Sequence, residues 1–376
     1  MTDLSAPILI VRPPRVAFGS GVAAQVGPWL AARGCRRVLV VADAFNAARV
    51  EVLGLAGTVT VYGRITAEPT TADLDAVTEA ALECGAEAVV GFGGGSAMDL
   101  AKLAAVLPGS GQSLADVVGV ELVQAKRAVL VQVPTTAGTG SEAGTRALVT
   151  DPRTFAKLAV QSEHMLADLA AIDPDLTLSM PAAITAATGV DALTHCVESF
   201  TNKRAHPTID HYALEGIRLV GRWLPRAIAD GGDRAARAGM ALASFYGGIC
   251  LGPVNTAAGH AVAYPLGTRH HVAHGAANAA IFPHVLAFNA PVVPERTALV
   301  LEALGLARET EPAAALAAAY GWCERIGCTM RLRDFGVTEA DIEIMATEAH
   351  AIRRLLDNNP RDLSREDIAA IYTAAF

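Results

Sequence analysis

The stretch AEAVVGFGGGSAMDLAKLAAVL, residues 86–107, decides the fold. It runs from a short apolar strand pattern through three glycines and Ser96 into a helical pattern. Successive glycines let the backbone approach a ligand closely, and the free N–H groups at the start of a helix favour an anion. An ordinary tight turn is the alternative, and the spacing is not the GxGxxG fingerprint. Three glycines followed by Ser96 nevertheless favour a pyrophosphate-binding turn.

Two further strand patterns lie around this stretch. RRVLVVAD (36–43) ends in Asp43, and AVLVQVPTTAGTGSE (128–142) ends in a loop rich in hydroxyl groups. Ligands of open α/β sheets bind at the carboxyl ends of the strands, so both ends are expected to face one nucleotide. Asp43 is the candidate partner of its ribose. Taken alone, Asp43 is more often a helix cap or a turn residue, and the hydroxyl-rich loop could simply cap the next helix.

The rhythm of strands and helices changes along the chain. Up to about residue 180, short β-rich runs alternate with amphipathic helical patterns, which predicts a parallel sheet covered by helices. After Pro181 almost only helical patterns remain, over 190–200, 209–228, 234–251 and much of 296–376. We therefore predict an α/β dinucleotide-binding domain over residues 1–180 and an all-helical domain over residues 181–376.

Composition excludes several classes of protein. The 376 residues carry 30 Lys and Arg against 38 Asp and Glu, a net charge of −8, which argues against nucleic-acid binding. Mean hydropathy is +0.34, but no run of about 18 apolar residues predicts a membrane span. The first 15 residues lack the features of a signal peptide, and the six cysteines are dispersed. A cytoplasmic protein with free thiols and no membrane or nucleic-acid partner is expected.

The helical half contains a candidate metal site. In TGVDALTHCVES, Asp191 and His195 are four residues apart and therefore on one face of a helix. GHAVAYPLGTRHHVAHGAANAA adds His260 and His274, and the intervening PLG is expected to interrupt the helix and put them on separate elements. An Asp-x3-His pair alone is usually a helical ion pair. One carboxylate and three imidazoles together indicate a divalent metal such as Fe²⁺ or Zn²⁺.

Three more side chains near these histidines are candidates for the chemistry. His270 and His271 lie between two predicted ligands, and Tyr264 follows His260 by one helical turn. All three side chains are expected to line a substrate pocket.

At this point the motifs match a known family. The chain resembles the iron-containing (group III) alcohol dehydrogenases in the motifs GGGSAMDLAK (93–102), PTTAGTGSE (134–142), AIDPDLTLSMP (171–181), GVDALTHCVESF (189–200), GHAVAYPLGTRHHVAHGAANA (259–279) and NPRDLSREDI (359–368). These motifs span nearly the whole chain in order. The resemblance implies a dehydroquinate synthase-like architecture, with a dinucleotide-binding domain followed by a helical metal-binding domain and the active site in the cleft between the two.

The resemblance also implies residue roles. Metal-ligand roles carry over to Asp191, His195, His260 and His274. Cofactor-binding roles carry over to Asp43, Gly94, Gly95, Ser96, Asp99, Thr135, Thr136, Gly138, Ser141, Lys157, Leu176 and Ser179. The family moves a hydride between NAD(P)H and a small aldehyde or alcohol whose oxygen the metal polarises. Reduction of a carbonyl also needs a proton donor, and a histidine titrates near neutrality whereas an ordinary phenol does not. We therefore expect His270 or His271, rather than Tyr264, to supply the proton, with direct delivery by water as the alternative.

Two positions depart from the family pattern. Many members carry a histidine at Tyr264, and the family's Asn-Pro-Thr near the cofactor is Glu68-Pro69-Thr70 here. NAD(H) is expected in preference to NADP(H), since Asp43 would repel a 2′-phosphate.

The resemblance leaves some choices open. Fe²⁺ is the expected metal with Zn²⁺ as the alternative, and a homodimer is expected. The rival function is an NAD- and zinc-dependent lyase resembling 3-dehydroquinate synthase. That activity needs several cations around an anionic substrate, and the ligand-bearing segments offer Arg269 and few others.

Overall fold

The computed structural model describes residues 5–65, 68–154 and 157–376. Its internal contacts divide the chain into two compact units. One unit, here called the nucleotide unit, comprises Ile10–Thr136 and Gly140–Leu178. The other, the helical unit, comprises Ser179–Phe376 together with Met1–Leu9 and Ala137–Thr139. In the part of the chain that the structure describes, no helix combines the length and the apolar character needed to cross a bilayer.

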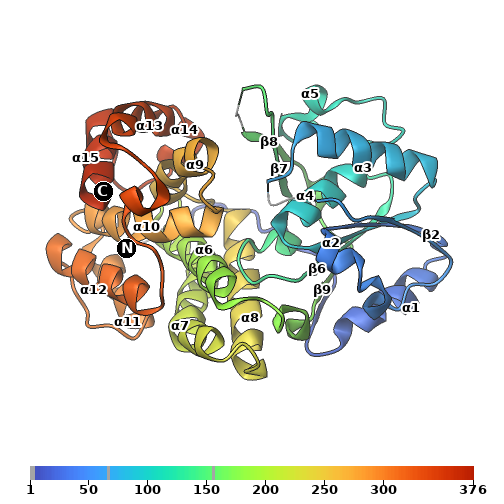
Figure 1. Cartoon of the computed structure of the whole chain (residues 1–376), viewed down its shortest axis with the longest axis horizontal. Helices are drawn as coiled ribbons and strands as arrows, with labels where there is room; N and C mark the ends of the chain where they lie inside the picture. The colour runs from blue at the N-terminus through green and yellow to red at the C-terminus, as the bar shows by residue number, and fades with distance from the viewer. Residues whose placement is uncertain (1–4, 66–67, 155–156) are drawn as a thin grey trace. The chain divides into compact units, whose positions relative to one another are not determined.

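The nucleotide unit is built on a six-stranded parallel sheet (Figure 1). Its strands in chain order are β1 (Val16–Phe18), β2 (Arg37–Ala42), β3 (Thr58–Tyr62), β4 (Ala88–Gly93), β6 (Val129–Pro134) and β9 (Leu169–Ile172). In space they follow the order β1-β9-β6-β4-β2-β3, and every pair is parallel. After β3 the chain returns to the other side of β2, so the order reverses between β2 and β4. A reversal of this kind is where ligands bind in open α/β sheets.

Both faces of this sheet are covered, which explains the continuous apolar strands in the sequence. Leu39 and Val41 face one hydrophobic cluster, together with residues of α3 (Thr71–Glu83) and α4 (Gly95–Ala104). Val38 and Val40 face the opposite cluster, with residues from α1 (Val26–Ala31) and the short 3₁₀ helices η1 (Val22–Gln25) and η2 (Val50–Leu53). Alternate residues of one strand thus pack against different layers. The parallel sheet predicted from the sequence is confirmed.

A second, three-stranded sheet was not predicted. It consists of β5 (Gly119–Val120), β7 (Arg146–Thr150) and β8 (Lys157–Gln161) in the order β5-β8-β7, and β7 pairs with β8 antiparallel. Between α4 and β5 lies the short helix α5 (Leu114–Val117), and after β8 come η4 (Glu163–Met165) and η5 (Pro174–Thr177). These strands are short and half-buried, so they lack the apolar run that marks β2, β4 and β6.

The helical unit contains ten α-helices among its described residues. They are α6 (Ala182–Thr201), α7 (Pro207–Ala229), α8 (Arg234–Leu251), α9 (Ala258–His270), α10 (His274–Asn289), α11 (Pro294–Ala303), α12 (Pro312–Arg325), α13 (Ile342–His350), α14 (Arg353–Leu356) and α15 (Arg365–Ala375). The helices α6, α7 and α8 pack against one another, and α9 and α10 share a core with α13 and α15 (Figure 1). The predicted all-helical character is confirmed.

The sequence predicted a helix break at PLG (265–267), and this position is wrong. Pro265 lies inside α9, which continues to His270 and ends where His271 takes a left-handed conformation with φ 54°. Proline removes one backbone N–H but does not by itself end a helix that is otherwise buried and packed. His260 and His274 still lie on separate helices, α9 and α10, because the chain turns at His271–Ala273.

Candidate functional site

Helix α6 supplies three acidic or imidazole side chains on one buried face. Asp191, His195 and Glu198 follow one another at intervals of four and three residues, so they lie one above the other along the helix. All three are buried. Buried charged groups need partners, and these find them on α9 and α10.

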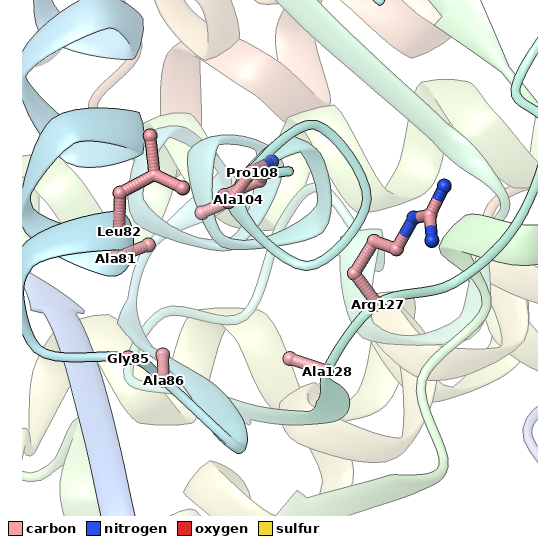
Figure 2. A pocket seen from close by; sticks show the side chains of 8 residues that line it. All are labelled: Ala81, Leu82, Gly85, Ala86, Ala104, Pro108, Arg127 and Ala128. Carbon is pink, nitrogen blue, oxygen red and sulfur yellow. The ribbon is translucent and has the colours of Figure 1, made fainter. Parts of the chain in front are cut away.

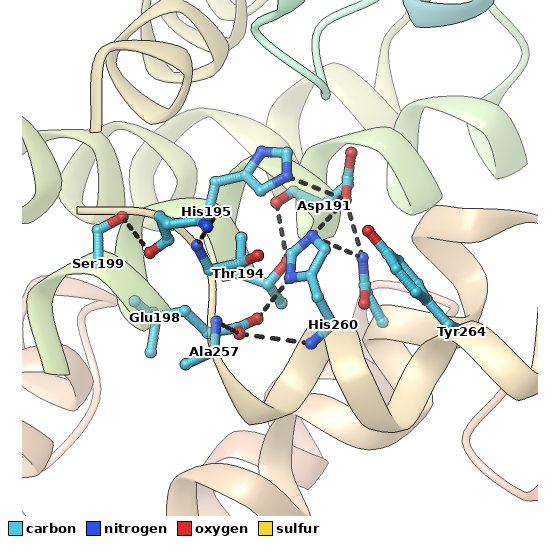
Figure 3. Close-up of polar contacts among 12 residues, drawn as sticks. Asp191, Thr194, His195, Glu198, Ser199, Ala257, His260 and Tyr264 are labelled. Atoms are coloured by element: carbon cyan, nitrogen blue, oxygen red, sulfur yellow. Dashed lines mark hydrogen bonds and ion pairs between the residues drawn. The ribbon is translucent and has the colours of Figure 1, made fainter. Parts of the chain in front are cut away.

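One oxygen of Asp191 is the point on which three imidazoles converge. Its Oδ1 lies 3.7 Å from Nε2 of His195, 3.6 Å from Nε2 of His260 and 3.5 Å from Nε2 of His274. The rings of His195 and His260 are stacked with centroids 4.7 Å apart (Figure 3). The ligating atoms of Asp191, His195 and His260 all lie within 4.8 Å of one another.

These spacings suit a first-row divalent metal. At ligand distances of about 2.0–2.2 Å, atoms at the corners of a tetrahedron are about 3.4 Å apart, close to the separations around Asp191. The donor set of three imidazoles and one carboxylate is one that Fe²⁺ and Zn²⁺ both accept. The residues therefore fit the metal that the sequence motifs imply.

Glu198, which the sequence analysis did not single out, holds His260 in place. Its Oε1 accepts a hydrogen bond from Nδ1 of His260 at 2.6 Å, and its Oε2 accepts from the backbone N–H groups of Ala257 and His260 at 2.5 and 3.3 Å (Figure 3). A proton on Nδ1 leaves Nε2, the nitrogen that faces Asp191, with its lone pair. Gly259 makes room for this carboxylate, since a Cβ there would lie 2.6 Å from Oε1.

These contacts shift the pKa values of the buried carboxylate and imidazole groups. Burial alone raises the pKa of Asp191, but the imidazoles of His195, His274 and His260 outweigh it and bring the pKa below its ordinary value. Burial alone lowers the pKa of His260, but the carboxylates of Glu198 and Asp191 raise it to about 10. Burial lowers the pKa of His195.

Asn278 is a second residue that sequence reasoning missed. Its Nδ2 donates to Oδ1 of Asp191 at 2.9 Å and lies 3.3 and 3.2 Å from Nε2 of His260 and His274. It follows His274 by four residues on α10, so it lies on the same helix face. That spacing, like the three-residue step from His195 to Glu198, is the signal that could have found these residues.

The structure brings Tyr264 close to the metal-binding residues, but not the two histidines expected to carry the proton. The Tyr264 ring centroid is 5.8 Å from that of His274. His270 instead lies at the far end of α9, about 15 Å further along the axis than His260, with its Nε2 3.8 Å from Asp341. His271 is exposed at the end of the helix. Because α9 continues through Pro265, it carries both histidines away from the cluster.

In the nucleotide unit, the predicted cofactor residues gather at the carboxyl ends of β2, β4 and β6. Asp43 caps the short helix α2 (Ala44–Ala47), and its carboxylate accepts from both nitrogens of Asn46. Asn46 also donates to the Thr135 hydroxyl at 3.2 Å. A Cβ on Gly93 would lie 3.4 Å from Oδ2 of Asp43. Asp43 is therefore both a cap and a neighbour of the glycine turn, at the point where strand order reverses.

The glycine turn itself has the predicted form. Gly94 is the residue before α4, and Gly95 and Ser96 open the helix. A Cβ on Gly94 would lie 3.4 Å from the Thr136 hydroxyl, so the turn and the hydroxyl-rich loop approach each other closely. A helix of ten residues begins at this turn, and the N-terminus of a helix favours an anion.

Other predicted cofactor residues have contacts within the protein. Asp99 on α4 accepts hydrogen bonds from the Ser141 hydroxyl at 2.6 Å and from the backbone N–H of Leu148 at 3.0 Å. The bond to Ser141 joins α4 to the hydroxyl-rich loop after β6. Lys157 on β8 forms an ion pair with Glu68 at 3.0 Å, the residue that departs from the family pattern.

The remaining three predicted cofactor residues, Leu176, Gly138 and Ser179, belong to different units. The Leu176 carbonyl accepts from Arg49 at 3.2 Å. Gly138 and Ser179 belong to the helical unit, where a Cβ on Gly138 would lie 2.9 Å from the Thr188 side chain on α6.

A cavity of about 150 Å³ lies elsewhere in the nucleotide unit (Figure 2). Gly85 and Ala86, just before β4, and Arg127 and Ala128, just before β6, line it together with Ala81, Leu82, Ala104 and Pro108. It is therefore at the amino ends of the strands, opposite to the edge where ligands of such sheets bind. We do not assign the cofactor to it.

Family models match both units in order. The model described as iron-containing alcohol dehydrogenase covers residues 13–174, and the model of the C-terminal part of the Fe-containing alcohol dehydrogenase family covers residues 185–376. Together they cover far more than half of the chain. The chain belongs to the iron-containing alcohol dehydrogenase family.

Relatives within the iron-containing alcohol dehydrogenases are similar over nearly their whole length. Long-chain-alcohol dehydrogenase 1 of Geobacillus thermodenitrificans is 37% identical, covering 98% of this chain and 96% of the relative. The NAD-dependent methanol dehydrogenase of Bacillus methanolicus is 31% identical, covering 96% and 98%. The crystal structure of a 1,3-propanediol oxidoreductase superposes with a TM-score of 0.93 at 31% identity, covering 99% of this chain and all of that one.

Membership of this family decides between the two enzyme classes that the sequence left open. The chain is an oxidoreductase that depends on a divalent metal and acts on alcohols or aldehydes, and the lyase alternative is not supported. The fold agrees, with a parallel α/β unit and a helical unit that carries the metal-binding residues.

Proposed function

We propose that this enzyme reduces small aldehydes with NADH. The single observation that supports this best is the convergence of His195, His260 and His274 on one oxygen of Asp191. A divalent metal held there supplies a Lewis acid for a carbonyl oxygen, and a bound nicotinamide supplies the hydride. Fe²⁺ is our preferred metal with Zn²⁺ as the alternative. A homodimer and a cytoplasmic location remain part of the proposal.

The direct test is an activity screen. The protein is stripped of metal, reconstituted with Fe²⁺ or Zn²⁺, and assayed for NADH oxidation with a panel of short aldehydes. We expect metal-dependent turnover with at least one aldehyde. A reconstituted protein that binds NADH and oxidises none of it with any member of the panel would contradict the proposal.

The residues of this chain have separate tasks in the proposed reaction. Asp191 and the three histidines hold the metal, and Glu198 keeps the proton of His260 on Nδ1. The glycine turn before α4 and the hydroxyls of Thr135 and Thr136 are suited to the phosphates and ribose of the cofactor. The oxygen that becomes the alcohol hydroxyl must also receive a proton, and Tyr264 is the protic side chain beside His274.

The proton path can be tested by comparing Tyr264 with the histidines. We expect Tyr264→Phe to lower kcat for aldehyde reduction by roughly tenfold or more, as loss of a general acid does. His270→Ala and His271→Ala should stay within a few-fold, because their rings lie away from the metal-binding residues. The sequence alone predicted the opposite order. Loss of activity in a histidine variant, with Tyr264→Phe active, would restore the histidine path.

Asp43 is the proposed determinant of cofactor choice. Each carboxylate oxygen has lone pairs beyond those that Asn46 uses, so it can accept from a ribose 2′-OH, whereas a 2′-phosphate would be repelled. We expect kcat/KM to favour NADH over NADPH. Asp43→Asn should reduce that preference by roughly five- to tenfold, the loss of one charge repulsion near the surface.

Asparagine is the appropriate substitution because it caps a helix as well as aspartate does, so α2 should be kept. Asp43→Gly removes both the charge and the cap side chain, and the two variants together separate these effects. An unmodified enzyme that prefers NADPH would contradict the assignment.

A further inference from the structure

We propose that Arg354 binds the negatively charged end of the substrate, and that the preferred substrates are short aldehydes carrying a carboxylate or sulfonate group. This inference rests on the proposed aldehyde reductase function and adds the substrate class to it. Four observations within the helical unit support it: the exposure of the metal-binding residues, the position of Tyr264, the contacts of Arg354, and the pairing of the neighbouring cations.

His274 is the most exposed of the four metal-binding residues. The side chains of Asp191, His195 and His260 are 4%, 6% and 3% exposed, whereas that of His274 is 31% exposed. A substrate oxygen is therefore expected to approach on the side of His274. The side chains next to His274 are the ones positioned to contact the rest of the substrate.

Tyr264 and Arg354 continue from His274 in that order. The rings of His274 and Tyr264 have centroids 5.8 Å apart, and the guanidinium carbon of Arg354 lies 5.6 Å from the Tyr264 ring centroid. Nη2 of Arg354 also donates to the Tyr264 hydroxyl at a long 3.4 Å. Each step is shorter than 6 Å, so the Tyr264 ring connects the guanidinium of Arg354 to the exposed side of His274.

Arg354 is the cation in this region that has no carboxylate partner in the described chain. Arg353, one residue earlier, pairs with Asp357, and Arg269 forms a two-point ion pair with Glu348 at 2.7 and 2.6 Å. Arg269, the cation that the sequence suggested for an anionic substrate, is thus already neutralised. Arg354 is exposed, while Leu355 and Leu356 anchor α14 in the core.

The chemistry of the guanidinium selects the ligand class. Its planar N–H groups match two oxygens of one carboxylate or sulfonate, which a neutral alkyl chain cannot offer. The Tyr264 ring beside it provides an apolar wall and a hydroxyl. An aldehyde with an anionic group a few carbons from the carbonyl satisfies both ends of this arrangement.

The experiment compares matched substrates in the reconstituted enzyme. The ratio of kcat/KM for 4-oxobutanoate to that for butanal is measured, and sulfoacetaldehyde against acetaldehyde provides the sulfonate arm. We expect ratios above one that fall with added KCl, because salt screens an exposed ion pair. Arg354→Leu should lower the ratios by roughly ten- to a hundredfold, as loss of a charged hydrogen bond does, and Arg354→Lys should restore part of it.

Arg353→Leu is the matched control, since it removes an adjacent exposed arginine that is already paired, and it should leave the ratios unchanged. Titration with succinate, which has the anionic ends without the aldehyde, gives a second measure, and its binding should weaken in Arg354→Leu alone. Equal losses with butanal and 4-oxobutanoate would mean that Arg354 acts through Tyr264 and would overturn the inference. So would ratios at or below one. If either of these results is found while butanal is still reduced, the substrate class is wrong but the proposed reductase function is still supported. If no aldehyde is reduced, both the reductase function and the substrate class are contradicted.

Discussion

His274→Ala should lose most of its bound metal and nearly all of its activity while keeping its fold. His274 supplies one of the three imidazole nitrogens around Asp191 and is the most exposed of them. Loss of a residue that only supports a ligand costs about 10–100-fold in metal affinity, so loss of a ligand should cost more than about 100-fold. Metal content after dialysis against a weak chelator, measured beside kcat and the unfolding midpoint, checks this.

His260→Ala should lose metal as well, but with a second effect. His260 is buried, and its removal leaves the Glu198 carboxylate without its imidazole partner. A buried charge that loses its partner destabilises the fold, so this variant should also unfold at a lower temperature. The difference in stability between the two variants separates metal binding from packing.

His211→Ala is the control, because His211 is exposed on α7 and contacts none of the metal-binding residues. Its metal content and activity should match those of the unmodified enzyme. Full metal occupancy in both His260→Ala and His274→Ala would show that the assigned ligands are wrong.

The sequence predicted those strands whose own residues form a recognisable apolar pattern. The strands β2, β4 and β6 are mainly apolar runs buried on both faces, and each lies within a stretch that the sequence predicted to contain a strand. The edge strand β1 has only three residues, two of them exposed, so no periodicity marks it. Strands β5, β7 and β8 owe their existence to pairing with one another, which a local pattern does not encode.

The four metal-binding residues were predicted for a different reason. Asp191 and His195 share a helix face, and the two later histidines lie close together in the sequence. Glu198 and Asn278 were missed because their roles depend on how α6, α9 and α10 pack, and a glutamate at that spacing is otherwise an ordinary helical residue. The position of the helix break was wrong for the same reason, since the tertiary context of Pro265 determines that α9 continues to His270.

Glu198→Gln should weaken metal binding by roughly 10–100-fold although Glu198 never touches the metal. The glutamine keeps the volume beside Gly259 but loses the charge that draws the proton of His260 to Nδ1, and its amide cannot accept at both ends. His260 then loses the tautomer and the orientation that present Nε2 toward Asp191. Affinity is measured by chelator competition, and the absorption of a Co²⁺-substituted enzyme reports the ligand geometry.

The control for this variant is Thr201→Val, on the same buried helix. Thr201 donates only to the backbone of Val197, so its loss perturbs α6 without reaching the ligands. Both variants should unfold somewhat earlier than the unmodified protein, but only Glu198→Gln should change the Co²⁺ spectrum and the metal affinity. If Glu198→Gln lowers the unfolding midpoint and leaves both metal readouts unchanged, the carboxylate merely fills space, and the orientation of His260 comes from the packing of α9 alone.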